Sequence, residues 1–469
     1  MSKIWRHQQE AIEWAEARLA NGQKYAIFAH GMGSGKTRTT LEFLKRQMAA
    51  RGITRVLVCC PKAVMPAWAK QGGMWLPGVR VVVLDKGGSK EKAKVVEAAI
   101  ADLTPLIVVV NYDSAWRIGL LEKVKWDAIV HDEIHRLKSP SGSASRWAGK
   151  LCKKHGDAIK IGLSGTLIPH SVLDLWAIYR SLEAPDCQTF GGTFTLHRAK
   201  YAVMANGQNW VVGYRNLDDA HKKIAATAHQ VKTLDVIDLP PITYEDVPCD
   251  LQPAEAKLYR EVDADFCAVV EAGAVTPKNA LEQLLRLQQI CGGYVKFDGD
   301  VIASKIADTP SKASILADML EDLPTDEPVV IFCRFRGDIE AAIGVCERAR
   351  RSYGELSGAK NELAAFQHGT TKTLITQIQS GGIGVDMSMS SYAFFYSLGY
   401  SLSEYEQAVA RLHRPGQAKH THIYHLVATL NGRKTVDGRV YEALRERKEI
   451  VEVIFDGYRR DGAASVSAR

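Results

Sequence analysis

The sequence predicts an α/β fold with doubly wound parallel sheets, arranged in two lobes with helical insertions. Short, continuous apolar segments alternate with amphipathic helical ones, which is typical of parallel strands buried on both faces. The alternation starts near Tyr25 and begins again at Ser311. A chain of 469 residues is also too long for one hydrophobic core. We therefore expect two sheets, each covered by its own helices.

The composition is that of an ordinary globular protein, with 46% hydrophobic and 24% charged residues. No apolar segment approaches the ~20 residues of a membrane span, and the N-terminus lacks the apolar core of a secretory signal. The nine cysteines form no C-x-x-C pair, which indicates free thiols in a reducing compartment. The net charge of +7 is compatible with a polyanion partner but does not require one. We expect a cytoplasmic protein without a membrane partner.

The first element is an amphipathic helix that starts near Ile4 and stops at Asn21-Gly22. Taken alone it reads as a surface helix. Gln8 is of interest because a glutamine amide can pair with both the donor and the acceptor edges of adenine, and a glycine-rich segment follows shortly after.

That segment, residues 27–37, reads Ile-Phe-Ala-His-Gly-Met-Gly-Ser-Gly-Lys-Thr between a strand and a helix. Small residues let backbone N–H groups surround a polyphosphate at a helix N-terminus, where Lys36 would reach the terminal phosphates and Thr37 would hold Mg²⁺. The alternatives are a flexible glycine turn and a dinucleotide fingerprint. The fingerprint fits less well because Lys36 stands where its third glycine is needed.

Three further strands are predicted at residues 56–60, 79–84 and 106–110. Lys62 follows the first of them, and Asn111 and Tyr112 follow the last. The alternation of strand, loop and helix favours a parallel sheet.

A strand at residues 126–131 delivers Asp132 and Glu133 at its carboxyl end, where such folds bind ligands. Asp132 could hold Mg²⁺ and Glu133 could orient a water molecule for phosphate hydrolysis. The alternative is a solvated turn. We interpret His135 as a hydrogen-bonding coupler, because no second cluster of metal ligands accompanies it.

The strand at residues 159–164 ends in Ser164, followed by Thr166, and is either a hairpin turn or a joint that couples the nucleotide site to a bound strand. A helix is expected at 170–182, an irregular insertion at 185–220, and a lobe boundary near Leu239-Pro240-Pro241.

The second half begins with mostly helical residues, 253–295, whose leucine stripe is more consistent with core than with a partner surface. Strands are then predicted at 328–333, 373–376 and 393–396. Residues 405–417 read as a helix that places Arg411 and Arg414 on one face, where two guanidinium groups form a fork for phosphate oxygens.

These observations predict four parts: a first lobe at 1–238 with an insertion at about 185–230, a linker and helical protrusion at 239–310, a second lobe at 311–455, and a flexible tail at 456–469.

Taken together, the motifs resemble the motor core of helicase superfamily two, specifically the Swi/Snf-type DNA translocases. The resemblance covers roughly residues 4–428 and rests on six ordered motifs, at 5–8, 32–37, 132–138, 163–169, 380–386 and 407–417. The helical residues 284–291 are similar to the stretch that this family carries before its second lobe. The chain departs from the family at His30-Gly31, where Asp-Glu is usual, and at Asp386, where Asn is usual.

The resemblance implies two RecA-like lobes that use ATP and Mg²⁺. It implies catalytic roles for Lys36, Asp132, Glu133, Arg411 and Arg414. The implied ATP contacts are Gln8, Met32, Gly33, Ser34, Gly35, Lys36, Thr37, Arg38, Gly384 and Asp386, with Thr37 and Asp132 at the metal. The implied coupling residues are His135, Ser164, Thr166 and Gln407, and the implied DNA contacts are Lys62, Asn111, Tyr112, Arg334, Ser380 and Tyr400.

The leading hypothesis is an ATPase stimulated by double-stranded DNA that moves on DNA, or remodels DNA or protein–DNA complexes, with weak sequence specificity. Two alternatives stay open: a strand-separating DNA or RNA helicase, and a non-catalytic nucleic-acid-binding scaffold. The compact chain resembles bacterial or phage members of the family, so we expect a monomer in the cytoplasm of a bacterium or a phage-infected cell. The sequence identifies no protein partner.

Overall fold

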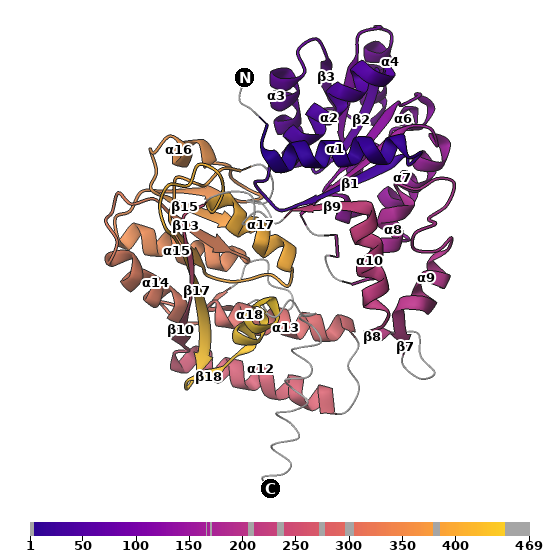
Figure 1. The fold of residues 1–469 in the computed structure, drawn as a ribbon. Coiled ribbons are helices and arrows are strands. Elements are labelled where there is room, and N and C mark those ends of the chain that lie inside the picture. The colour runs from indigo at the N-terminus through magenta and orange to yellow at the C-terminus, as the bar shows by residue number, and fades with distance from the viewer. Residues whose placement is uncertain are drawn as a thin grey trace. The chain divides into compact units, whose positions relative to one another are not determined.

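The protein folds into two compact units, Met1–Asp238 and Leu239–Arg469, here called the first and second lobes (Figure 1). The computed structural model describes residues 4–165, 167–168, 171–204, 211–231, 239–271, 277–295, 304–378 and 385–445. Three predicted site residues, Thr166, Ser380 and Gly384, and the predicted tail at 456–469 lie outside the described residues.

The first lobe is built on a seven-stranded sheet in the order β3-β4-β2-β5-β6-β1-β9, in which every neighbouring pair is parallel. Three of its strands are buried along their whole length and a fourth at all but its first residue, as the continuous apolar segments predict. The α/β parallel fold class is therefore confirmed. The strands are β1 (Tyr25–His30), β2 (Arg55–Cys60), β3 (Arg80–Val83), β4 (Leu106–Asn111), β5 (Ala128–Asp132), β6 (Ile159–Ser164) and β9 (Ala228–Val231).

Helices connect these strands. The helix expected at the N-terminus ends at Asn21 as predicted, and the helix after the glycine-rich segment ends at its C-cap Gly52. The helices are α1 (Arg6–Ala20), α2 (Lys36–Arg51), α3 (Met65–Trp75), α4 (Ser89–Ile100), α5 (Tyr112–Ala115), α6 (Leu120–Lys123), α7 (Ser143–Lys154) and α8 (Asp174–Arg180), with 3-10 turns η1 (Lys62–Val64) and η2 (Ile134–Leu137).

The insertion at 185–220 is not irregular, so that prediction is wrong. It contains α9 (Phe194–Tyr201) and the antiparallel pair β7 (Ala202–Met204) and β8 (Val211–Tyr214), and then α10 (Leu217–Thr227) begins. Thr193 caps α9 by accepting a hydrogen bond from Leu196 N, and Tyr201 is fully buried in the lobe core. Tertiary burial of these side chains outweighs the turn-forming glycines.

The parallel sheet determines where functional residues gather. All strands of the first lobe run in the same direction, so their carboxyl ends meet at one edge. At that edge β1 ends at His30, β4 at Asn111, β5 at Asp132 and β6 at Ser164. In the sheet β6 lies between β1 and β5, which brings the glycine-rich segment beside the acidic pair.

The second lobe contains a parallel sheet in the order β10-β17-β16-β13-β15-β14, with the short β18 antiparallel to β17. Along its central strand, Val330 and Phe332 belong to one core cluster while Val329 and Ile331 belong to another, so both faces of the sheet are covered. The strands are β10 (Ile242–Asp250), β13 (Val329–Cys333), β14 (Tyr353–Leu356), β15 (Thr373–Gln377), β16 (Tyr392–Phe395), β17 (Thr421–Leu430) and β18 (Arg433–Lys434), and a separate antiparallel pair is formed by β11 (Tyr294–Val295) and β12 (Ser304–Lys305).

The helix predicted at 405–417 is α17 (Leu402–Leu412), so Arg411 is in its last turn and Arg414 lies beyond its end. The prediction that both arginines share one helical face is therefore wrong. The residue before a proline is disfavoured in the helical region, and Pro415 follows Arg414 directly. The other helices are α12 (Pro253–Glu271), α13 (Pro277–Cys291), α14 (Ser311–Glu321), α15 (Arg336–Arg348), α16 (Leu363–Gln367) and α18 (Val436–Arg445).

Three further expectations can be compared with the described residues. Leu284, Leu287 and Ile290 are fully buried, so this stripe is core. The eight cysteines whose side chains are described are free and buried. Among the helices in the described part of the chain, none combines the length and apolar character needed to cross a bilayer.

Candidate nucleotide site

The glycine-rich loop joins the end of β1 to the start of α2. Gly33 and Gly35 adopt left-handed backbone conformations, with φ of 76° and 78°. A Cβ on Gly35 would lie 2.3 Å from Gln8 Nε2. A side chain at Gly35 would therefore have to displace the Gln8 amide. The backbone amides of the loop lead into a helix N-terminus, which attracts anions.

Lys36 lies over this loop. Its Nζ donates hydrogen bonds to His30 O at 2.9 Å and to Gly31 O at 3.3 Å. Ser34 stays within the loop, its hydroxyl donating to Gly31 O at 2.6 Å. The ammonium group is thus held where a polyphosphate on the loop would need a positive charge.

The start of α1 is fixed to the same loop. Gln8 Oε1 accepts from Trp5 N at 3.0 Å, and Gln8 Nε2 donates to Ser34 O at 3.3 Å. His7 Nε2 also donates to Ser34 O, at 2.9 Å. Both functions of the Gln8 amide contact protein atoms in this structure, and its predicted contact with adenine stays a prediction.

The Arg38 guanidinium lies 3.4 Å from the centre of the Trp75 ring, and its Nη2 lies 3.6 Å from Glu42 Oε2. This stack ties the first turn of α2 to the end of α3. The predicted ATP contacts of Arg38, Met32 and Thr37 stay predictions.

The acidic pair lies at the end of β5. Asp132 and Glu133 are both 5% exposed, and Glu133 has a left-handed backbone with φ of 51°. Burial, and then the charge of Glu133, raise the pKa of Asp132. The charge of Lys36 acts on Asp132 in the opposite direction, which reflects how close the loop lies to the acids.

Two neighbours hold Asp132 in place. Trp68 Nε1 donates to its Oδ2 at 2.8 Å, and the Tyr112 hydroxyl donates to its backbone oxygen at 2.8 Å. The sequence places Trp68 and Tyr112 after two different strands, and nothing in their spacing indicates that either would reach Asp132.

The donor set fits Mg²⁺. Two buried carboxylates stand side by side, and Glu133 Oε2 accepts no hydrogen bond. The described residues contain no group of three or more histidine, cysteine or acidic side chains arranged for a metal. Mg²⁺ needs no such cage, because it keeps several waters and is commonly held by one or two carboxylates and by phosphate. Asp132 is therefore placed to hold it, and the predicted part of Thr37 in this site stays a prediction.

His135 connects the acidic pair to β6. Its Nδ1 lies 3.3 Å from Glu133 Oε2 and 3.2 Å from the Ser164 hydroxyl. The structure thus brings these two predicted coupling residues together beside Glu133.

A pair of histidines that the sequence analysis missed lies at the end of β1, where the loop begins. His30 Nε2 is 3.0 Å from His229 Nδ1, and His229 comes from β9. Burial, followed by the charges of His229 and Lys36, lowers the pKa of His30 to about 3. No local pattern places β9 beside β1, so only the fold reveals this pair.

The predicted DNA contacts of the first lobe differ in exposure. Lys62 is exposed. Asn111 and Tyr112 are buried, and Asn111 Oδ1 accepts from Ser114 N, capping α5. These residues lie at the carboxyl ends of adjacent strands, but Asn111 Oδ1 and the Tyr112 hydroxyl form hydrogen bonds within the protein.

The second lobe carries the remaining candidates. Arg414 Nη1 lies 3.8 Å from Asp386 Oδ2 and donates to Val385 O at 3.5 Å. Gln407 is 8% exposed. The Arg334 guanidinium lies 4.3 Å from the centre of the Tyr400 ring. The structure therefore groups Arg414 with Asp386, and Arg334 with Tyr400.

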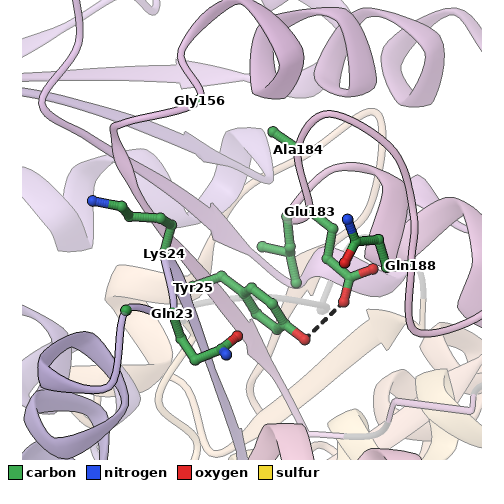
Figure 2. Close-up of a pocket in the computed structure, with 9 residues that line it drawn as sticks. Gln23, Lys24, Tyr25, Gly156, Glu183, Ala184 and Gln188 are labelled. Atoms are coloured by element: carbon green, nitrogen blue, oxygen red, sulfur yellow. Dashed lines mark hydrogen bonds between the residues drawn. The ribbon is translucent and has the colours of Figure 1, made fainter.

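A separate pocket of the first lobe lies at the other end of β1 (Figure 2). Tyr25, the first residue of β1, donates its hydroxyl to Glu183 Oε1 at 2.8 Å there, and Lys24 and Gln188 also line the pocket. A six-residue strand spans roughly 20 Å, so this pocket is distinct from the loop at the carboxyl end of β1.

Comparisons with known proteins agree with these features. The SNF2-related domain matches residues 7–293, and the helicase conserved C-terminal domain matches residues 311–416. An uncharacterized ATP-dependent helicase of Mycoplasma genitalium is 22% identical over 462 residues, 96% of this chain and 42% of that protein. A probable ATP-dependent DNA helicase of Arabidopsis thaliana, CHR12, is 22% identical over 466 residues, 94% of this chain and 40% of that protein.

The chain thus spans about two fifths of the length of these curated relatives. A solved SWI2/SNF2 ATPase core of Sulfolobus solfataricus in complex with dsDNA is 20% identical, with a TM-score of 0.45 and coverage of 100% of this chain and 96% of that chain. Because the SNF2-related domain alone matches more than half of the residues, the resemblance drawn from the motifs is confirmed, and the chain belongs to the SNF2-related family.

Proposed function

We propose that this protein is an ATPase stimulated by double-stranded DNA and that it uses hydrolysis to move along DNA. One observation carries the proposal. Lys36, Asp132 and Glu133 meet at one edge of a single sheet, and His135 ties Glu133 to the end of the adjacent strand. The relatives' names, ATP-dependent helicase and ATP-dependent DNA helicase, support the choice of ATP and DNA.

In this proposal the backbone amides of the loop and Lys36 bind the phosphates of ATP. Asp132 and Thr37 hold Mg²⁺, which would supply positive charge to the phosphate oxygens. Glu133 accepts a hydrogen bond from the attacking water and orients it. Its Oε2 is buried and accepts no hydrogen bond, and His135 Nδ1 lies 3.3 Å from it.

Arg411 and Arg414 are proposed to neutralise the charge that develops on the phosphates, as arginine fingers do. They belong to the second lobe, so hydrolysis would require the lobes to close and product release would let them reopen. Alternation between these states would step the protein along DNA. Contacts mainly to phosphates would make binding weakly sequence-specific and dependent on salt.

The test is ATP turnover by the full chain with duplex, forked and single-stranded DNA and with RNA. The proposal expects duplex DNA to give the largest stimulation, without lasting strand separation in a parallel unwinding assay. Stimulation by RNA alone, or unwinding of forked DNA, would instead favour a strand-separating helicase.

A matched pair of lysine variants tests whether the activity arises at this site. Lys36→Ala should lower turnover by about 100-fold or more, the usual cost of removing a group that stabilises transition-state charge. Lys24→Ala, which changes an exposed residue before the other end of β1, should match the wild type. Equal turnover in Lys36→Ala and wild type would reject this site, and absence of turnover in the wild type would favour a scaffold.

A further inference from the structure

Asp132 is held by two side chains that the proposed chemistry has not used. Trp68 lies in α3 and is 1% exposed, and its indole N–H donates to the Asp132 carboxylate. Tyr112 is 5% exposed, and its hydroxyl donates to the backbone oxygen of the same residue. Side chain and main chain of Asp132 are therefore fixed by different parts of the fold.

Both holding residues come from segments that carry candidate DNA contacts. Trp68 follows β2 and the exposed Lys62. Tyr112 directly follows Asn111 at the end of β4. Because β2 pairs with both β4 and β5, the two segments follow the two strands on the same side of β5, the strand that ends at Asp132. A shift of either segment would reach Asp132 through a single hydrogen bond.

The Trp68 contact has a defined chemical consequence. An indole has one donor and no acceptor, so it engages only Oδ2 and leaves Oδ1 independent of it. A hydrogen bond to an ionised carboxylate is stronger than one between neutral groups. It therefore selects one orientation of the carboxylate in a buried site, where a cation-binding oxygen must be held in place.

We propose that Trp68 is a positioning residue, which with Tyr112 orients Asp132 toward Mg²⁺ and links it to the segments that would contact DNA. This inference rests on the proposed function for the identity of the cation and of the polymer. The competing explanation is that Trp68 only fills the core.

The same lobe contains a matched control for that explanation. Trp126 is 2% exposed, and its Nε1 donates to Leu121 O at 2.7 Å. Trp126→Phe removes the same atoms as Trp68→Phe, and it also removes a buried hydrogen bond from an indole. The acceptor that loses its partner is a backbone carbonyl before the start of β5 and not the carboxylate at its end. A purely structural role predicts the same behaviour for both variants.

The first measurement is the rise in melting temperature that a non-hydrolysable ATP analogue causes, with EDTA and with increasing Mg²⁺, using the full chain. For Trp68→Phe we expect the rise in melting temperature in EDTA to be unchanged. The Mg²⁺ requirement, meaning the Mg²⁺ concentration at which the additional rise is half complete, should be about 10- to 100-fold higher, the usual cost of losing an outer-shell partner. Trp126→Phe should require Mg²⁺ as the wild type does. A wild-type Mg²⁺ requirement in Trp68→Phe, or an equal increase in Trp126→Phe, would overturn the inference.

A second pair of variants removes only one oxygen, and it tests the positioning of Asp132 through Tyr112 if Trp68→Phe does not fold. Tyr112→Phe should raise the Mg²⁺ requirement about 2- to 10-fold, the worth of one neutral hydrogen bond. Tyr25→Phe is its control, because the Tyr25 hydroxyl donates to Glu183 at 2.8 Å at the far end of β1. Equal requirements in these two variants would refute the link through Tyr112.

The readout also separates this inference from the proposed function. Melting in Mg²⁺ and nucleotide involves no DNA and no hydrolysis. If no DNA or RNA stimulates ATP turnover but Trp68→Phe needs more Mg²⁺ than the wild type, the proposed function is rejected and the positioning role of Trp68 is supported. A wild type without any Mg²⁺-dependent rise would contradict the positioning role itself.

Discussion

The contact between Gly35 and Gln8 allows a prediction whose size can be worked out from the structure. Gly35 and Gly52 cap the two ends of α2, and both are left-handed, with φ of 78° and 67°. Alanine in this conformation costs about 1–2 kcal/mol. At Gly52 a new Cβ meets nothing within 4 Å, whereas at Gly35 it lies 2.3 Å from Gln8 Nε2.

The difference between the two sites is the cost of displacing the Gln8 amide. That amide ends a flexible side chain and can turn aside, so the loss is the hydrogen bonds to Trp5 N and Ser34 O. Each is worth about 0.5–1.5 kcal/mol. Gly35→Ala should therefore lower the free energy of unfolding by about 2–5 kcal/mol, and Gly52→Ala by about 1–2 kcal/mol.

Calorimetry of the full chain tests this, with the first lobe identified as the transition that an ATP analogue raises. At about 2–4 °C per kcal/mol for a unit of this size, Gly35→Ala should melt roughly 2–12 °C below Gly52→Ala. In a Gln8→Ala background the two glycine variants should become equal, because the clash is gone. Equal melting of the two variants with Gln8 present would refute the reasoning.

Four further predictions follow from the same geometry. Glu133→Gln should keep nucleotide affinity within about 3-fold but lower turnover by at least about 100-fold, since it removes the group that orients water; equal losses in binding and turnover would contradict that role. Arg414→Ala should lower turnover by about three decades or more in a single-turnover assay, and a smaller loss would exclude it as a finger. Lys62→Ala should weaken duplex DNA binding for all sequences and reduce the salt slope by about 1, with an unchanged slope showing that Lys62 touches no phosphate. The pKa of His30 is lowered to about 3 by burial, against about 6.5 when unfolded, so the unfolded chain takes up the proton first. Stability should then fall by about 1.4 kcal/mol per pH unit as pH drops below about 6.5, and His30→Asn should flatten this slope in urea denaturation at several pH values; a slope unchanged by the substitution would count against burial of a neutral imidazole.

The sequence alone was sufficient for the strands whose burial is continuous. β2, β4 and β6 are covered on both faces, so the sequence of each is a nearly uninterrupted apolar segment, which is typical of a buried parallel strand. The same reasoning failed for β10, whose residues are mostly exposed at the sheet edge, and for the short β9 and β14. Where burial is partial, as in β10 and β9, or the strand has only four residues, as in β14, the local pattern no longer distinguishes a strand from a loop.

The site divides in the same way. The order of glycines, lysine and paired acids follows from the chemistry of phosphate and Mg²⁺, so the sequence indicated Lys36, Asp132 and Glu133 directly. It gave no sign that Trp68 or Tyr112 would hold Asp132, or that His229 would lie against His30. The two residues of each pair are separated by 20 or more positions in the sequence. Hydrogen bonds between residues so far apart leave no periodic pattern in the sequence that could predict them.

What the sequence determined by itself was therefore the family, the parallel α/β architecture and the identity of the reactive groups, because each depends on residue type and local spacing. Only the tertiary structure decided which groups meet. The order of strands in the first sheet places β1, β6 and β5 side by side, so that loop, acids and histidine share one edge, and the early end of α17 separates Arg411 from Arg414. Strand order and helix ends are set by packing between distant segments, which no local pattern records.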